Sequence, residues 1–250
     1  MPPDARMIFP ADRPSLRGAK LRTQRAASHI AEIESVITQW SSENANTFVM
    51  TVPRSQLEGE EGYRPKFDWS QATSPPSAWV GIVAGEALYN LRAALDYLVH
   101  ALAWLDSGMP QDYTQFPIAG TADSFQTQRT QRLVGINNAH VDALAEYQPF
   151  NGCQWTATLQ ELSNPDKHRT LTSVYRELSG SFRIVREHLL DDPTDPDRLI
   201  IPQSDTSVEL RFWNDRPVVN TLTNLARETA QVLQIFQIDF GESDELTMAK

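Results

Sequence analysis

The sequence predicts an α+β fold: mainly a helical bundle with a small antiparallel sheet. Residues Ala78 to Leu105 carry a broad apolar stripe at three- and four-residue steps, the longest helical pattern in the chain. A stretch near each end of the chain also has one apolar face at helical spacing. The strand-like segments are too few and too clustered for alternating βαβ units. Helices therefore predominate, and the strands are expected to form a small sheet attached to them.

The N-terminal third predicts a helix and then a strand. Residues Leu21 to Trp40 repeat apolar side chains at three- and four-residue steps, which indicates a helix with one buried face. Residues Thr47 to Val52 are rich in β-branched and aromatic residues, and Pro53 follows them. We therefore expect a short strand there, followed by a polar loop.

The middle of the chain predicts the central helix and several shorter ones. The stripe of the central helix consists of Ala84, Ala87, Leu88, Leu91, Leu95, Leu98, Leu102 and Leu105. After Gly108 and Pro110 end this helix, Phe116-Pro117-Ile118 predicts an extended piece anchored by its apolar side chains. Shorter helices are expected over Ala122 to Leu133, Asn137 to Tyr147 and Gln154 to Leu162.

The last third predicts the rest of the sheet and a final helix. Strands are expected at Phe182 to Glu187, Leu199 to Ile201 and Val208 to Trp213, with the Thr47 strand completing the sheet. Pro217 opens a helix with heptad-like apolar spacing. Its series is Val218, Leu222, Leu225, Thr229, Val232 and Phe236. We expect residues 1–250 to form a single domain, with the sheet drawn from about 47–52 and 182–213.

Charge and composition narrow the classes of function. The net charge of -10 argues against a general nucleic-acid binder, because nonspecific affinity for phosphates comes from positive charge. The single cysteine, Cys153, cannot form an intrachain disulfide. No apolar run is long enough to span a bilayer, so we expect no membrane association and a cytoplasmic location.

The segment Ser163 to Arg169 predicts an anion site. Asn164-Pro165 is typical of a helix start, and apolar residues at helical spacing continue to Leu178. Lys167, His168 and Arg169 would then lie beside free N–H groups at the positive end of the helix dipole. Lys167 and Arg169 could hold a phosphate or carboxylate, and His168 could transfer a proton near neutral pH. The alternative is that these charges are solvated or pair with the central helix.

The central helix also carries a polar stripe. At about 100° per residue, its polar residues fall within an arc of about 120°, with Arg92 just outside. The stripe consists of Glu86, Tyr89, Asn90, Asp96, Tyr97 and His100. It is either a solvated face with ordinary ion pairs or one wall of a partly buried cleft. In the second case the Asp166 to Arg169 segment is its expected partner.

A basic segment lies near the N-terminus of this acidic chain. It consists of Arg13, Arg17, Lys20, Arg22 and Arg25, with no acidic residue between Asp12 and Glu32. One interpretation is the exposed start of an amphipathic helix. The other is a docking site for RNA, DNA or an acidic partner.

Three blocks of the sequence resemble a known group of proteins. The blocks Gly85 to Asp96, Phe116 to Ile118 and Asp166 to Arg169 contain the motifs NLRxALD, FPI and DKHR, in the order found in a family of uncharacterised bacterial proteins. That family implies no activity. More distantly, an Arg followed by a His on one helix resembles the HEPN ribonucleases, whose signature places four to six residues between the two. Arg92 and His100 are separated by one residue more than the longest spacing.

Two hypotheses follow. The HEPN resemblance implies a metal-independent ribonuclease in a toxin or phage-defence setting, in which Arg92 stabilises phosphate charge and His100 or His168 moves the proton. Glu86, Asn90, Asp96, Lys167 and Arg169 would then bind substrate. The alternative is a noncatalytic binding or assembly protein whose polar cluster is structural. No metal or cofactor is expected, since no compact metal-binding spacing occurs. The expected partner is RNA or another phosphate-bearing ligand. A homodimer is a further option that the sequence does not decide.

Overall fold

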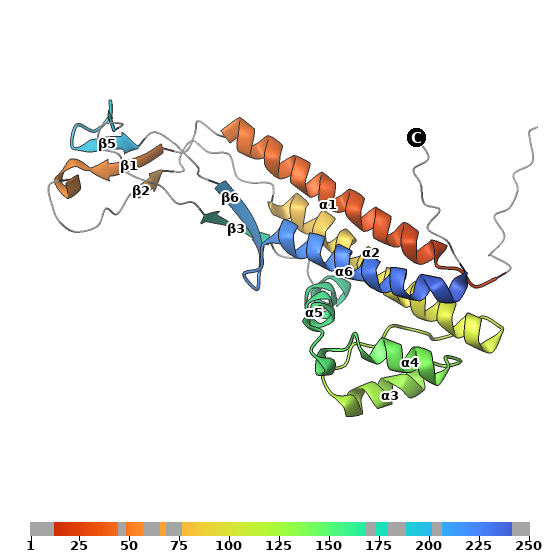
Figure 1. The fold of residues 1–250 in the computed structure, drawn as a ribbon. Coiled ribbons are helices and arrows are strands. Elements are labelled where there is room, and N and C mark those ends of the chain that lie inside the picture. Colours follow the sequence, from red (N-terminus) through yellow and green to blue (C-terminus); the bar gives the residue numbers. More distant parts are fainter. Residues whose placement is uncertain are drawn as a thin grey trace, which may run out of the picture. The chain divides into compact units, whose positions relative to one another are not determined.

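The α+β, mainly helical fold predicted from the sequence is confirmed in the computed structural model (Figure 1). The structure describes residues 13–44, 49–57, 66–68, 77–168, 174–179, 189–201 and 207–241. The chain divides into two compact units. The first consists of Met1–Ile30, Ile82–Thr172 and Asn220–Lys250, and the second of Ala31–Gly81 and Ser173–Val219. The division falls within three long helices, and the expectation of one domain over residues 1–250 stays a prediction.

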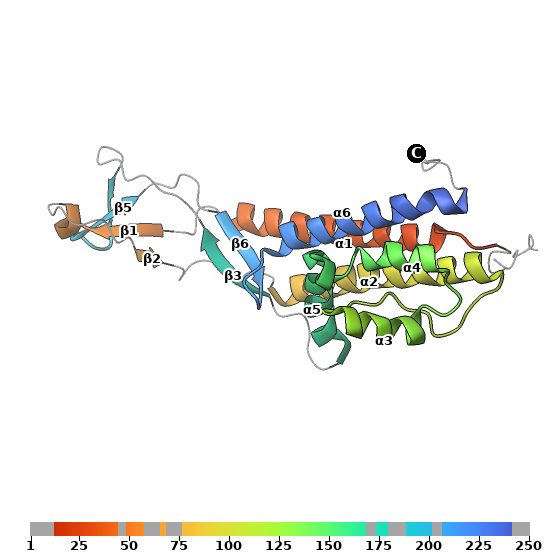
Figure 2. The same cartoon turned by 60° about the horizontal axis from the view of Figure 1, so that its bottom comes forward.

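Three long helices supply most of the buried apolar surface. They are α1 (Arg17–Asn44), α2 (Ser77–Ser107) and α6 (Val218–Gln237). Their parts in the first unit lie side by side in both views (Figures 1 and 2). Within α2, the predicted leucines from Leu88 to Leu102 are fully buried. All five apolar residues predicted for the α6 stripe are buried too, so the periodicity identified the core faces correctly.

The shorter helices of the first unit follow the predicted order. They are α3 (Ala122–Arg132), α4 (Asn138–Ala145) and α5 (Gln154–His168), with short 3₁₀ turns η2 (Pro149–Asn151) and η4 (Ile238–Phe240). Thr121 and Asn137 cap α3 and α4, because each side-chain oxygen accepts a hydrogen bond from a free backbone N–H three residues on. The segment Phe116 to Ile118 is irregular backbone and fully buried, as its apolar side chains predicted.

Two small antiparallel sheets belong to the second unit. One contains β1 (Val49–Pro53), β2 (Lys66–Asp68), β4 (Leu190–Asp191) and β5 (Arg198–Ile201), in the order β2-β1-β5-β4. A 3₁₀ turn, η1 (Arg54–Leu57), follows β1. The predicted strands near residues 47–52 and 199–201 therefore pair with each other. The predicted strand at 182–187 lies outside the described residues.

The other sheet corrects one prediction. It pairs β3 (Val174–Ser179) with β6 (Ser207–Phe212), so the predicted strand near 208–213 joins β3 in a separate sheet. The helix expected from Pro165 to Leu178 is wrong over residues 174–178, which belong to β3. Residues Val174 and Tyr175 satisfy β propensity as well as helical spacing, and pairing with β6 decides between the two.

In the part of the chain that the structure describes, none of the helices combines the length and apolar character needed to cross a bilayer.

Candidate functional site

Arg92 and Asp96 hold the backbone of Phe116 against α2. Arg92 is only 6% exposed, and its Nη2 donates a hydrogen bond to the Phe116 carbonyl oxygen. The Phe116 N–H donates to Asp96 Oδ1 at 2.9 Å, and the same Asp96 oxygen lies 3.4 Å from Arg92 Nη2. Because irregular buried backbone has no secondary-structure partner, these two side chains satisfy both polar groups of Phe116. We call Arg92, Asp96 and Phe116 the Phe116 clamp.

The electrostatics of the clamp follow from burial. Burial lowers the pKa of the Arg92 guanidinium, the Asp96 carboxylate raises it, and the charge of Arg132 lowers it. An arginine still keeps its charge at any ordinary pH. Its Nη1 is buried and has no hydrogen-bond partner among the described residues. A charge held this far from water depends on Asp96 and the Phe116 carbonyl for its stabilisation.

The polar stripe of α2 finds partners on α1. Arg22 Nη1 donates to Asn90 Oδ1 at 3.1 Å, and Asn90 Nδ2 donates to the Glu86 carbonyl oxygen at 2.8 Å. The Arg22 guanidinium carbon lies 5.7 Å from the ring centre of Tyr89 and 5.6 Å from that of Tyr97. Sequence reasoning identified these α2 residues as polar groups in need of partners, but it named Arg22 only as part of the basic segment and not as their partner.

Glu86 also pairs with α1. Its Oε2 lies 3.5 Å from Nδ1 of His29, a side chain that is 3% exposed, while the Glu86 side chain is half exposed. His29 was not singled out from the sequence, although a His beside an apolar helix face is a visible signal. The sequence predicts the Asp166 to Arg169 segment as the partner of Glu86 and Asn90, and that contact stays a prediction. The partners that the structure describes on another helix are His29 and Arg22 of α1.

His100 lies at the surface, whereas Arg92 is buried. His100 is exposed, and its Nδ1 lies 3.3 Å from Thr114 Oγ1. At 1.5 Å per residue, eight residues separate the two backbone positions by about 12 Å along the helix axis. The structure gives no contact that joins the two proposed catalytic side chains within the part it describes.

The predicted helix start at Asn164-Pro165 is wrong. Both residues lie inside α5, which begins at Gln154 and ends at His168. Lys167 and His168 therefore occupy its last turn, where the helix dipole favours cations and offers no free N–H groups to an anion. Lys167 and His168 are therefore not part of a helix N-terminus that could bind an anion. The side chains of Lys167 and His168, and all of Arg169, lie outside the described residues, so their approach to Asp96 stays a prediction.

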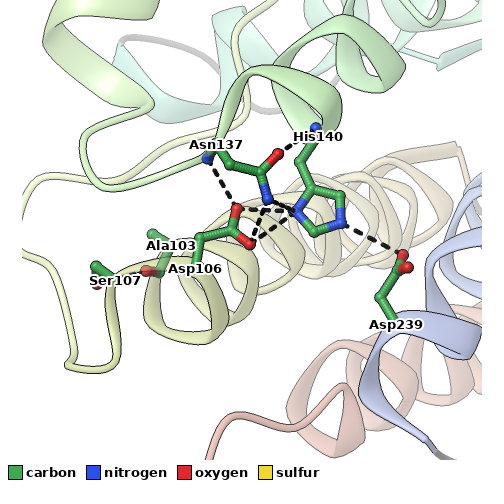
Figure 3. Close-up of polar contacts among 6 residues, drawn as sticks. All are labelled: Ala103, Asp106, Ser107, Asn137, His140 and Asp239. Carbon is green, nitrogen blue, oxygen red and sulfur yellow. Dashed lines mark hydrogen bonds and ion pairs between the residues drawn. The ribbon is translucent and has the colours of Figure 1, made fainter.

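A further polar cluster was missed from the sequence (Figure 3). His140 on α4 faces two carboxylates, with Nδ1 2.8 Å from Asp106 Oδ2 and Nε2 3.5 Å from Asp239 Oδ2. The Asn137 N–H and Nδ2 donate to Asp106 at 2.9 and 2.7 Å. Asp106 lies in the last turn of α2 and Asp239 in η4. The helix cap at Asn137 was predictable, but nothing local in the sequence places Asp106 or Asp239 beside it.

The contacts of this cluster connect three elements of the fold, which indicates a structural role. The side chains of Asp106 and His140 are 6% and 15% exposed, and their contacts tie together α2, α4 and η4. The nearby Ser107 hydroxyl donates to the Ala103 carbonyl at 2.6 Å (Figure 3), so it is not paired with His140. Among the described residues, no three His, Cys, Asp or Glu side chains are grouped to hold a metal ion.

Comparison of the chain with models of protein families, with curated sequences and with solved structures gives no match. The resemblance of the three sequence blocks to a bacterial family, and that of Arg92 and His100 to HEPN ribonucleases, therefore stay expectations from the sequence. Any assignment of function depends on the geometry of this chain.

Proposed function

We propose that this protein is a noncatalytic binding or assembly protein in which the polar residues of α2 are structural. The observation that carries the proposal is the Phe116 clamp. Arg92 is the residue that a ribonuclease would use on phosphate, but its Nη2 is already bonded to the Phe116 carbonyl and paired with Asp96. A buried guanidinium with these partners is a poor ligand for an anion that arrives from solvent, since binding would take the donor from the buried Phe116 carbonyl and the positive charge from Asp96.

The other polar residues of α2 support the same interpretation. Asn90 is buried and bonded to Arg22, and Glu86 is paired with His29. Each contact joins α1 to α2, which is what a scaffold requires. RNA or another phosphate-bearing molecule is the partner we propose, with a homodimer as a further option and the cytoplasm as the location.

The competing proposal, a HEPN-like ribonuclease, is tested directly. Purified protein is incubated with single-stranded RNAs of varied sequence in excess chelator, and the products are resolved on a gel. We expect no cleavage above that of an identically purified His100→Ala, His168→Ala double variant. Cleavage by the wild type that falls at least about a hundredfold in that variant, with an unchanged unfolding midpoint, would overturn the noncatalytic proposal.

A further inference from the structure

Basic residues are concentrated at the start of α1 and just before it. The segment from Arg13 to Arg25 contains five basic residues, and no acid occurs between Asp12 and Glu32, in a chain whose net charge is -10. Arg13, Arg17 and Arg25 are exposed and form no ion pair with any described residue. Unpaired arginines concentrated on one short segment produce a local positive potential that attracts polyanions.

Two exposed tyrosine rings lie beside one cation of this segment, Arg22. Tyr89 and Tyr97, two helical turns apart on α2, are 52% and 45% exposed, with the Arg22 guanidinium near both rings. Arg22 makes one hydrogen bond to a described residue, the bond from Nη1 to Asn90, and this bond fixes its position between the rings. The result is one cationic group held between two partly exposed aromatic rings.

Glycine at position 18 sets the position of one ring. A Cβ atom there would lie 2.6 Å from Tyr97 Cδ1, closer than carbon atoms can approach, so only glycine lets the ring pack against the α1 backbone. Tyr97 is therefore held in place although nearly half of it is exposed. A ring held in place at the surface loses little conformational freedom when a flat partner stacks on it.

We propose that this surface, formed by Arg17, Arg22, Arg25, Tyr89 and Tyr97, binds single-stranded nucleic acid. The arginines contact phosphates, and the exposed parts of the tyrosine rings stack on unpaired bases. The inference rests on the proposed binding function and names its partner and its location. It does not involve the Phe116 clamp.

The aromatic groups favour single-stranded nucleic acid over other polyanions. An acidic protein segment offers carboxylates to Arg17 and Arg25 but no flat ring to stack on Tyr89 and Tyr97. In a duplex the faces of the bases are already covered by their neighbours, so the tyrosines gain nothing there. The acidic remainder of the chain repels phosphates, so binding should be confined to this surface and weaken steeply with salt.

The test measures fluorescence anisotropy of a labelled 20-nucleotide single-stranded RNA of mixed sequence, with the full chain, in excess chelator and at several salt concentrations. We expect saturable binding by the wild type, weakened at least about fivefold by Tyr97→Ala, as loss of one stacked base implies. Tyr97→Phe, which keeps the ring, should bind like the wild type. The double variant Arg17→Gln, Arg25→Gln should weaken binding and flatten its salt dependence. The variant Arg227→Gln, at an exposed arginine on α6, should do neither.

The possible results separate this inference from the proposed function. Equal binding by the wild type and Tyr97→Ala, tighter binding of the matching duplex, or equal competition by polyglutamate would overturn the surface proposal and leave a binding protein of another kind. No binding by the wild type at low salt would overturn it as well. RNA cleavage in the same samples that falls at least about a hundredfold in the His100→Ala, His168→Ala double variant would overturn the noncatalytic function instead. Unfolding midpoints of all variants confirm that the comparison is made between folded proteins.

Discussion

Replacing Arg92 with methionine tests whether the Phe116 clamp stabilises the fold. Methionine keeps an unbranched stem of similar helix propensity but removes the guanidinium. The Phe116 carbonyl then loses a hydrogen bond from a charged donor, which is worth about 1.5 to 3 kcal/mol. Asp96 loses its charge partner, but its side chain is 29% exposed and water compensates in part, so this adds at most about 1 kcal/mol. We expect Arg92→Met to lower the free energy of unfolding by about 1.5 to 4 kcal/mol.

One effect opposes this loss. Burial of the guanidinium is itself costly, as the lowered pKa of Arg92 indicates, and an apolar replacement removes that cost. For an isolated buried ion pair, such replacement is often neutral. Here the backbone groups of Phe116 cannot be removed by mutation, so any variant that removes Arg92 leaves a buried carbonyl without a donor. That orphaned carbonyl is the reason why destabilisation should dominate.

Urea unfolding followed by circular dichroism measures the free energy of unfolding of the variant. A decrease of about 3 kcal/mol in that free energy should also lower the thermal midpoint by about 6 to 12 °C in a chain of this size. Arg227→Met is the matched control, because Arg227 is exposed on α6, and it should change stability by less than about 0.5 kcal/mol. If Arg92→Met unfolds within about 0.5 kcal/mol of the wild type, the clamp does not stabilise the fold, and Arg92 becomes available again as a functional residue.

Three further predictions concern packing and the single cysteine. Leu225→Asp should abolish cooperative unfolding or lower the free energy of unfolding by more than about 4 kcal/mol, because Leu225 is buried. In the same urea titration, Ile235→Asp on the exposed side of α6 should change the free energy of unfolding by less than about 1 kcal/mol. Burial raises the pKa of the Cys153 thiol, so less thiolate is present at pH 7.5 than in a free cysteine. Iodoacetamide should therefore label native Cys153 more slowly than urea-unfolded protein, and the native rate should rise with pH; equal rates would contradict this. Gly18→Ala should destabilise the wild type, since its Cβ meets the Tyr97 ring, but should stabilise a Tyr97→Ala background by up to about 1 kcal/mol through helix propensity. Thermal midpoints of the four proteins test this, and the same sign in both backgrounds would refute it.

The helices could be predicted because their cause is local. The apolar spacing of residues 84–102 alone identifies the buried face of α2, and the structure confirms it. Helix ends were less accurate. The helical pattern suggested a start at Leu21, but α1 begins at Arg17, because Leu16 and Ala19 are also buried and extend the same face.

The error at Pro165 shows how one local signal supports two structures. Asn-Pro is typical of a helix start, but α5 continues through it, with Leu159 and Leu162 buried just before. Proline lacks the N–H that would bond the carbonyl of Glu161, and that residue is exposed, so water can replace the lost bond. The strand that follows depends on pairing with β6, about 30 residues further on, which no local pattern contains.

The partners of polar groups were the least predictable feature. Arg22 and Asn90 are 68 residues apart, and Asp106 and His140 are 34 apart. The sequence indicated that buried polar groups on α2 need partners, but many basic residues could have satisfied that need. Choosing among them requires the packing of α1 against α2, which depends on apolar contacts elsewhere along both helices.

The Phe116 clamp also changes what the three sequence blocks imply. Arg92 and Asp96 come from the first block, and Phe116 begins the second. The three residues bond to one another, so their occurrence together in one chain has a physical reason that involves no substrate. If the protein has an activity, its chemistry must come from residues outside this contact, such as His100 or the Asp166 to Arg169 block. The variants of His100 and His168 therefore test the enzyme hypothesis, whereas a variant of Arg92 tests the fold.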